Sequence, residues 1–123
     1  MERQIRQVED LEVFRKAYQK SLEIHHQTLA FPKIEQYGGI GDQVRRASKG
    51  ICASLAEGFG KQSHSKAEFK RYISIAIGSA DEIRLWLSYA ADLGYLTKVQ
   101  VKIHRNDYQV IAKMLTGLHR NWS

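Results

Sequence analysis

The spacing of apolar residues is the feature that most limits how this chain can fold. Hydrophobic side chains recur every three or four residues through four long segments, which is typical of helices that bury one face. A single proline, Pro32, occurs in the 123 residues, and no internal repeat or low-complexity stretch divides them. We therefore predict an all-α chain forming one domain, residues 1–123, with residues 1–9 as a flexible N-terminal segment.

The first two predicted helices cover about residues 10–30 and 41–59. The stripe expected to face the core in the first consists of Leu11, Phe14, Tyr18, Leu22, His25 and Leu29. This helix should end near Phe31, because the residue before a proline disfavours the helical conformation. The second stripe consists of Ile40, Val44, Ala47, Ile51, Leu55 and Gly58, and Gly60 favours termination.

The third and fourth predicted helices each begin with a capping-box pattern, Ser65 with Glu68 and Thr97 with Gln100. The third stripe consists of Phe69, Ile73, Ala76, Ala80, Ile83, Leu87 and Ala90, before Gly94 ends the helix. The fourth consists of Val101, His104, Tyr108, Ile111, Leu115, Leu118 and Trp122. Because the connections are short, successive helices should run antiparallel, as an up-down-up-down four-helix bundle.

Additional apolar residues lie beside the main stripes of the third and fourth helices. Those that we assign to a subunit interface are Tyr72, Ile75, Trp86, Tyr89, Val99, Ile103, Val110 and Met114. A wide apolar arc also fits a generously filled monomer core, but contiguous exposed apolar area typically marks a contact site. Gly78 and Gly117 lie within helices, where glycine costs about 1 kcal/mol relative to alanine. Close helix approach, within one chain or between chains, would explain them.

Positive charge is the first indication of function. The chain carries 19 lysines and arginines against 13 acidic residues, a net charge of +6, which favours anionic partners but is also found in ordinary soluble proteins. We assign to a nucleic-acid surface Arg45, Arg46, Lys49, Lys61, Lys66, Lys70, Arg71, Lys102 and Arg105. Phe59, Phe69 and Tyr72 are interleaved with these residues and would stack on bases where exposed, but Phe69 lies on the stripe predicted to face the core. A solvated basic face without a ligand is the open alternative.

Motifs for catalysis or metal binding are incomplete. A dinuclear metal site in a bundle uses two Glu-x-x-His pairs, and the chain has one, Glu23 with His26. His104 and Asp107 lie one turn apart without a further carboxylate–histidine set, and Cys52 has no histidine near it in sequence. We therefore expect no enzymatic activity, no bound metal and no cofactor. A metalloenzyme is the least favoured of the function classes considered.

Sequence features also indicate the cellular compartment. No secretory signal is visible at the start, and the longest run free of charged residues and histidine, residues 72–80, is too short to span a bilayer. The lone cysteine excludes an intramolecular disulfide and fits a reducing compartment. We expect a cytoplasmic protein that does not contact a membrane.

Several segments resemble the motifs of one known family. They are residues 9–14, 16–17, 31–38, 43–48, 55–61, 68–69, 76–82, 93–96 and 114–118, of which Ala-Glu-Gly-Phe-Gly at 56–60 is fairly specific. Over about residues 8–120 the chain is similar to the four-helix-bundle proteins encoded in intervening sequences of bacterial 23S ribosomal RNA genes. That family is related in fold to Avd, the accessory protein of diversity-generating retroelements.

The resemblance implies a homo-oligomer, typically a homopentameric ring of bundles with a basic surface, and it supplies no catalytic residues. It also implies an RNA-linked or ribosomal role, while the Avd branch binds nucleic acid and a reverse transcriptase. Our leading hypothesis is a non-enzymatic oligomeric bundle that binds RNA, or RNA and DNA, through basic helix faces. The alternative is a protein-interaction scaffold, such as an accessory factor for a reverse transcriptase or a partner of a ribosomal component.

Overall fold

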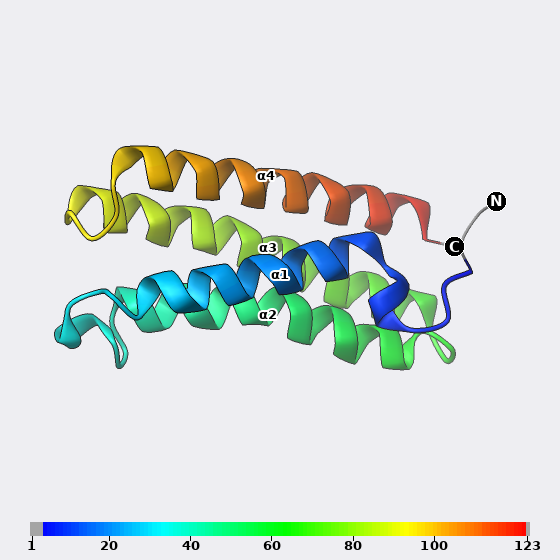
Figure 1. Cartoon of the computed structure of the whole chain (residues 1–123). Coiled ribbons are helices and arrows are strands. Elements are labelled where there is room, and N and C mark those ends of the chain that lie inside the picture. Colours follow the sequence, from blue (N-terminus) through cyan, green and yellow to red (C-terminus); the bar gives the residue numbers. More distant parts are fainter. Residues whose placement is uncertain (1–3, 123) are drawn as a thin grey trace.

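Residues 4–122 are described by a computed structural model, and all the regular structure among them is helical. Four long helices lie side by side, as Figure 1 shows: α1 (Glu12–Thr28), α2 (Ile40–Lys61), α3 (Lys66–Asp92) and α4 (Lys98–Asn121). Two short 3-10 helices, η1 (Val8–Asp10) and η2 (Lys33–Glu35), precede α1 and α2. The predicted all-α fold with four helices is confirmed.

Successive helices run in opposite directions, as the short connections predict (Figure 1). α2 packs extensively against both α1 and α3, and α3 packs against α4, whereas α1 and α4 meet over a smaller area. The bundle is therefore built from three close helix pairs in chain order and one looser seam. Long polar side chains cross that seam, as described below.

The N-terminal segment that we expected to be flexible is partly held by the fold. Residues 1–3 lie outside the described residues. Val8 is buried, and the backbone N–H groups of Arg6 and Gln7 donate to the carboxylate of Asp10, at 2.9 and 3.1 Å. These contacts attach the segment from Arg6 onward to the start of the bundle.

The boundaries of α3 and the start of α4 follow the predicted capping residues, whereas α2 continues through Gly60 to Lys61. Thr97 and Gln100 form both hydrogen bonds of a capping box at the start of α4. At the start of α3, the hydroxyl of Ser65 accepts from the backbone N–H of Glu68 at 3.1 Å, whereas the Glu68 carboxylate pairs with Arg71. Gly94 follows α3 with a φ of 78°, a conformation that glycine adopts without steric cost.

The core consists mainly of the stripes predicted for α2, α3 and α4. All seven residues of the α3 stripe are buried, as are Val44, Ala47, Ile51, Leu55 and Gly58 of α2 and Val101, His104, Tyr108, Ile111 and Leu115 of α4. Burying such apolar side chains contributes about 25 cal/mol for each Å² removed from water. For these three helices, the apolar pattern alone identifies the buried face.

The stripe predicted for α1 is wrong at most positions, although Leu11, just before the helix, is buried and Phe14 packs against the core. Tyr18, Leu22 and Leu29 are exposed by 48%, 42% and 55%. The buried residues of α1 are instead Val13, Ala17, Lys20, Ser21, Ile24 and Thr28. The true core face lies roughly one residue, or about 100°, around the helix from the predicted one.

The buried face of α1 is stable because its polar groups have partners. The hydroxyl of Ser21 donates to the carbonyl of Tyr18 at 2.7 Å, and that of Thr28 donates to the carbonyl of Ile24 at 2.8 Å. The ammonium group of Lys20 is bound by side chains of α1 and α4. Burial of a polar group is costly mainly when it lacks a hydrogen bond, so this face tolerates three polar residues.

Glycines mark one close helix contact inside the chain. A Cβ atom built on Gly58 of α2 would lie 2.4 Å from the Cβ of Tyr72 on α3, so only glycine fits there. Cβ atoms on Gly78 and Gly117 would meet nothing within 4 Å. A close approach within the chain therefore does not explain the two mid-helix glycines, and the explanation by contact between chains stays a prediction.

Candidate nucleic-acid interface

The nine basic residues assigned to a nucleic-acid surface lie in three separate places. Arg45, Arg46 and Lys49 are in the first half of α2, whereas Lys61, Lys66, Lys70 and Arg71 surround the α2–α3 turn. Lys102 and Arg105 lie on the side of α4 that faces α3. The structure therefore does not gather them into one surface.

Arg45 holds the connection between α1 and α2. Its guanidinium donates to the hydroxyl of Thr28 at 3.1 Å and to the carbonyl of Gln36 at 2.8 Å. The side-chain amide of Gln36 in turn donates to the carbonyls of Thr28 and Phe31, at 3.0 and 2.9 Å. The charge of Arg45 is thus directed into this loop, which gives the residue a structural role.

The two neighbours of Arg45 in the predicted set are more accessible. Arg46 forms an exposed ion pair with Asp42 at 3.2 Å. The Lys49 ammonium lies 3.1 Å from Nδ1 of His25 on α1. Desolvation, followed by the charge of Lys49, lowers the pKa of His25, which favours its neutral, hydrogen-bond-accepting form. Lys49 therefore lies beside α1, whereas Arg46 pairs within its own helix.

At the α2–α3 turn, two basic side chains cover the ring of Tyr72. The charged groups of Lys61 and Arg71 lie 5.1 and 4.8 Å from its ring centre, within the range of cation–π attraction. The Tyr72 hydroxyl accepts from Lys61 at 3.1 Å and donates to Glu57 at 3.2 Å, while Arg71 pairs with Glu68 at 3.0 Å. These two cations are largely engaged within the chain, and Lys66 and Lys70 carry the freer charge of this turn.

The aromatic side chains considered for base stacking are already packed. Phe69 is completely buried, with its ring centre 5.6 Å from that of Phe59 and 4.9 Å from that of Trp122. Tyr72 is covered by cations, as described above. Phe69 is therefore a core residue, as its position on the predicted stripe indicates, and the rings of Phe59 and Tyr72 are engaged by other side chains.

Lys102 and Arg105 line a hollow between α3 and α4. It has a volume of about 530 Å³ and is also lined by Lys98 of α4 and Arg84 of α3. Arg105 is positioned by a 2.9 Å hydrogen bond that its guanidinium donates to the hydroxyl of Ser88. The two predicted residues therefore share this hollow with further cations.

A second hollow extends the first along the same two helices. Its volume is about 460 Å³, it shares Arg84 and Gln109 with the first hollow, and it is also lined by Lys113 and Arg120. The two open hollows adjoin at these shared residues, and together we call them the α3–α4 groove. From Lys98 to Arg120 the groove follows α4 for about 33 Å, at a rise of 1.5 Å per residue.

Basic side chains follow one line along α4. The exposed polar residues at steps of four and three are Lys98, Lys102, Arg105, Gln109, Lys113, Thr116 and Arg120. With Arg84 of α3, the groove contains six cations, and its carboxylates are Asp81 and Asp92. Positive charge therefore dominates the whole length of the groove.

Most cations of the groove are unpaired. Arg84 binds Asp81 at 3.3 Å. Among residues 4–122, Lys98, Lys102, Lys113 and Arg120 take part in no ion pair or side-chain hydrogen bond. These charges are available to an external anion.

Two features of the groove escape prediction from the sequence. Asp107 is the one acidic residue between residues 98 and 123, but it points to α1, where it binds Lys20 at 2.7 Å, so it does not offset the groove. Arg84 is missed because it lies on α3, and only the pairing of α3 with α4 brings it beside Lys102 and Arg105. The other basic residues of the groove all lie on α4, and their spacing of three and four residues is the sequence signal that identifies them.

The residues predicted to form a subunit interface are mostly exposed in the single chain. Ile75, Tyr89, Val99, Ile103 and Val110 are exposed by 43% to 69%, so they do not fill the monomer core. Tyr72, Trp86 and Met114 are partly buried. The eight residues lie on α3 and α4, and none of them lines the α3–α4 groove. Association through these side chains would leave the groove open.

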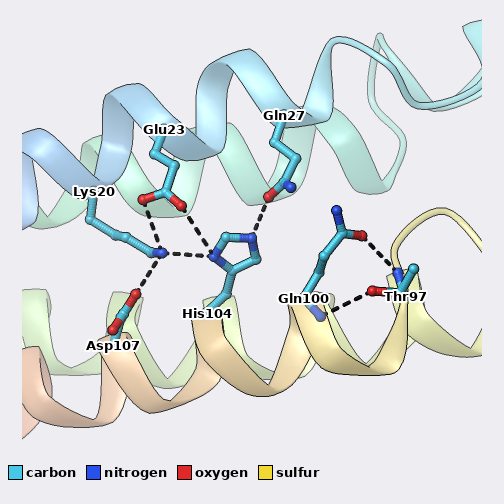
Figure 2. Close-up of polar contacts among 7 residues, drawn as sticks. All are labelled: Lys20, Glu23, Gln27, Thr97, Gln100, His104 and Asp107. Atoms are coloured by element: carbon cyan, nitrogen blue, oxygen red, sulfur yellow. Dashed lines mark hydrogen bonds and ion pairs between the residues drawn. The ribbon is translucent and has the colours of Figure 1, made fainter.

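A polar network fills the seam between α1 and α4, as Figure 2 shows. The Lys20 ammonium, with only 6% of the side chain exposed, lies 2.7 Å from Asp107 Oδ2, 2.7 Å from His104 Nδ1 and 3.2 Å from Glu23 Oε2. The other ring nitrogen of His104 is hydrogen-bonded to the amide oxygen of Gln27. One buried cation therefore joins two helices through two carboxylates and an imidazole.

The hydrogen bonds assign the neutral tautomer of His104. An ammonium group only donates, so Nδ1 accepts from Lys20 and Nε2 carries the proton donated to Gln27. Burial, and then the charge of Lys20, lowers the pKa of His104, although the carboxylates of Glu23 and Asp107 oppose this shift. The imidazole is therefore an uncharged part of the seam at neutral pH.

The remaining candidates for catalysis lack the necessary geometry. Glu23 turns toward Lys20 and His104, whereas His26 is exposed and lies against His25. Within the described chain, no cluster of three or more His, Cys, Asp or Glu side chains could hold a metal ion. Burial raises the pKa of the Cys52 thiol to about 11, which disfavours the nucleophilic thiolate. None of the described helices is long and apolar enough to cross a membrane.

Comparison with known proteins identifies the family. A protein of unknown function from the S23 ribosomal protein family of Bacteroides thetaiotaomicron VPI-5482 is similar in structure, with a TM-score of 0.78 and 24% sequence identity. The match covers 89% of this chain and 99% of that one, and at this identity it shows the fold alone. No curated protein matches the chain. The family model for the 23S rRNA-intervening sequence protein matches residues 9–117, and the chain therefore belongs to that family.

Proposed function

We propose that this protein is a non-enzymatic bundle that binds RNA through basic helix faces. The observation that carries the proposal is the α3–α4 groove, which is lined by six cationic side chains and only two carboxylates over a length of about 33 Å. Lysines and arginines that neutralise phosphates release condensed counterions, so binding should weaken steeply as salt rises. Membership of a family named for 23S rRNA intervening sequences favours RNA over DNA as the natural partner.

The test is the affinity of a fluorescent RNA hairpin, measured by anisotropy over a series of salt concentrations. We expect binding at low salt that falls with rising salt. The double variant Lys102→Glu with Lys113→Glu should lose binding. The matched control, Lys16→Glu with Lys33→Glu, changes the net charge equally at exposed positions outside the groove and should retain most of it. Absence of RNA binding by the wild-type protein at low salt would refute the proposal.

We also propose that the chain self-associates into a homopentameric ring. The support is the exposed apolar surface of α3 and α4, which includes Tyr89 and Ile103, together with the open space around mid-helix Gly78. A ring uses two different faces of each subunit, and apolar residues on two helices fit that requirement. Light scattering should give a mass five times the 14.1 kDa of the chain. A monomer at micromolar concentration would contradict the ring.

A second candidate function is a scaffold that binds protein. The loop between α1 and α2 presents Ile34 and Tyr37, exposed by 82% and 90%, while Arg45 and Gln36 hold its backbone in place. Rigidly held, exposed aromatic side chains are typical anchors of protein interfaces. A reverse transcriptase or a ribosomal component would be such a partner. Co-purification of a protein that survives nuclease treatment but is lost with Tyr37→Ala would favour this candidate.

We place this function in the cytoplasm, where a single free cysteine such as Cys52 persists without a disulfide partner. Fractionation of cells that express the untagged chain should recover it with cytoplasmic markers. Recovery with the membrane fraction would contradict this assignment.

A further inference from the structure

We infer that the α3–α4 groove binds the phosphate backbone of base-paired nucleic acid and does not read its bases. The inference rests on the proposed function and specifies its ligand. It selects one of the three basic regions as the binding site and one form of nucleic acid as the preferred partner. The lining of the groove, its positive charge and its length favour this ligand.

The groove lacks the side chains that hold single strands. Its lining consists of charged residues, amides, hydroxyls and small aliphatic side chains, and none of its lining residues is aromatic. Proteins that bind single strands gain about 1–3 kcal/mol for each base stacked on an aromatic ring. An unpaired strand laid along this groove would gain the phosphate contacts alone.

Charge density then decides between the two forms. Double-stranded DNA carries one charge per about 1.7 Å of axis, whereas one strand has one per about 3.4 Å. Along the roughly 33 Å of the groove, a duplex therefore presents about twice as many phosphates as a single strand. Because base stacking contributes nothing to binding in this groove, the duplex, which has the higher charge density, should bind more tightly than the single strand.

The polar residues of the groove fit a contact with phosphate groups. Between Arg105 and Lys113 lies Gln109, and between Lys113 and Arg120 lies Thr116, so neutral hydrogen-bond donors alternate with cations along α4. Phosphate oxygens accept hydrogen bonds from such amides and hydroxyls, and these contacts position a ligand without specifying its sequence. Binding should therefore depend little on base sequence.

The other two basic regions are less suited to this role. Arg45 is committed to the α1–α2 loop, and Arg46 is paired with Asp42. At the α2–α3 turn, Lys61 and Arg71 are bound to Tyr72 and to acidic neighbours. The groove is the region in which most cations have no partner among the described residues.

The experiment compares two RNA probes at equal phosphate concentration, a duplex of about 20 base pairs and an oligouridine of equal strand length, with polyglutamate as a third anion. We expect the duplex to bind at least roughly ten-fold more tightly than oligouridine, and polyglutamate more weakly than the duplex. Lys102→Gln with Lys113→Gln should weaken duplex binding about ten-fold or more at low salt, whereas Lys16→Gln with Lys33→Gln should leave it nearly unchanged. All four positions are exposed, and thermal unfolding of each variant verifies its fold.

Each result separates the inference from the function on which it rests. If neither RNA binds at low salt, the proposed function fails, and this inference fails with it. If the duplex binds but the groove variant binds it as the wild type does, the RNA-binding function stands and the groove is the wrong site. Equal affinity for oligouridine or for polyglutamate would overturn the preference for base-paired nucleic acid.

Discussion

Mild acidification is expected to destabilise the bundle through His104. The imidazole lies in the α1–α4 seam with Lys20 on one ring nitrogen and Gln27 on the other, and its pKa is lowered in the folded chain. In the unfolded chain its pKa returns to about 6.5. As the pH falls below that value, the unfolded state takes up the proton first, so the equilibrium shifts toward unfolding.

The size of the effect follows from linkage. The stabilisation is complete above about pH 6.5 and is lost as the pH falls toward the lowered pKa of the folded state. While only the unfolded chain carries the additional proton, the free energy of unfolding falls by at most about 1.4 kcal/mol for each pH unit. Protonation in the folded state would place a second positive charge beside the ammonium of Lys20, 2.7 Å from Nδ1.

Urea unfolding between about pH 5.5 and 7.5 measures this slope, because the range covers the ordinary titration of histidine and lies above that of carboxylates. His104→Gln provides an amide that accepts from Lys20 and does not titrate, so its stability should vary less with pH. His64→Gln serves as the control, because it also removes one histidine but at an exposed position in the α2–α3 turn, away from the α1–α4 seam, so the pH slope should be retained. An undiminished pH slope in His104→Gln would refute the reasoning.

Three further predictions concern packing, the α1–α2 loop and the thiol. Gly58→Ala should destabilise the chain, because the added Cβ would collide with Tyr72. Gly78→Ala, where the added Cβ meets open space, should stabilise an unassembled chain by up to about 1 kcal/mol. Thermal unfolding of the two variants measures both effects. Arg45→Gln should lower the free energy of unfolding by about 1–3 kcal/mol in urea, because loop acceptors lose their donors, and an unchanged midpoint would contradict this. Cys52 should react slowly with Ellman's reagent at neutral pH until the chain unfolds, and rapid labelling of the folded chain would disprove the assignment of a packed thiol.

Sequence patterns predict the helices whose cores are apolar. In α3, every core position is apolar or alanine, so the spacing of Phe69, Ile73 and the residues that follow identifies the buried face. In α1 the same method selects Tyr18 and Leu22, which are exposed. The method fails there because the real core face includes a charged residue, Lys20, which an apolar pattern passes over. Its burial depends on His104 and Asp107, more than 80 residues away, and a local pattern contains no information about such partners.

The candidate site also combines features that local sequence patterns predict with features that depend on distant partners. The basic line along α4 is visible as steps of three and four, and Lys102 and Arg105 lie on this exposed face of the helix. The contribution of Arg84 depends on how α3 is aligned with α4. Conversely, Arg45 carries a charge that the sequence suggests is free, but the fold directs it to the carbonyl of Gln36.

The salt dependence of duplex RNA binding by the groove variant tests the central claim most directly. A plot of the logarithm of the binding constant against the logarithm of salt concentration has a slope of about −0.9 for each phosphate neutralised in a duplex. If the α3–α4 groove holds the phosphate backbone, Lys102→Gln with Lys113→Gln should reduce the magnitude of the wild-type slope by nearly 2. A slope equal to that of the wild-type protein would show that these lysines contact no phosphate and would contradict the account.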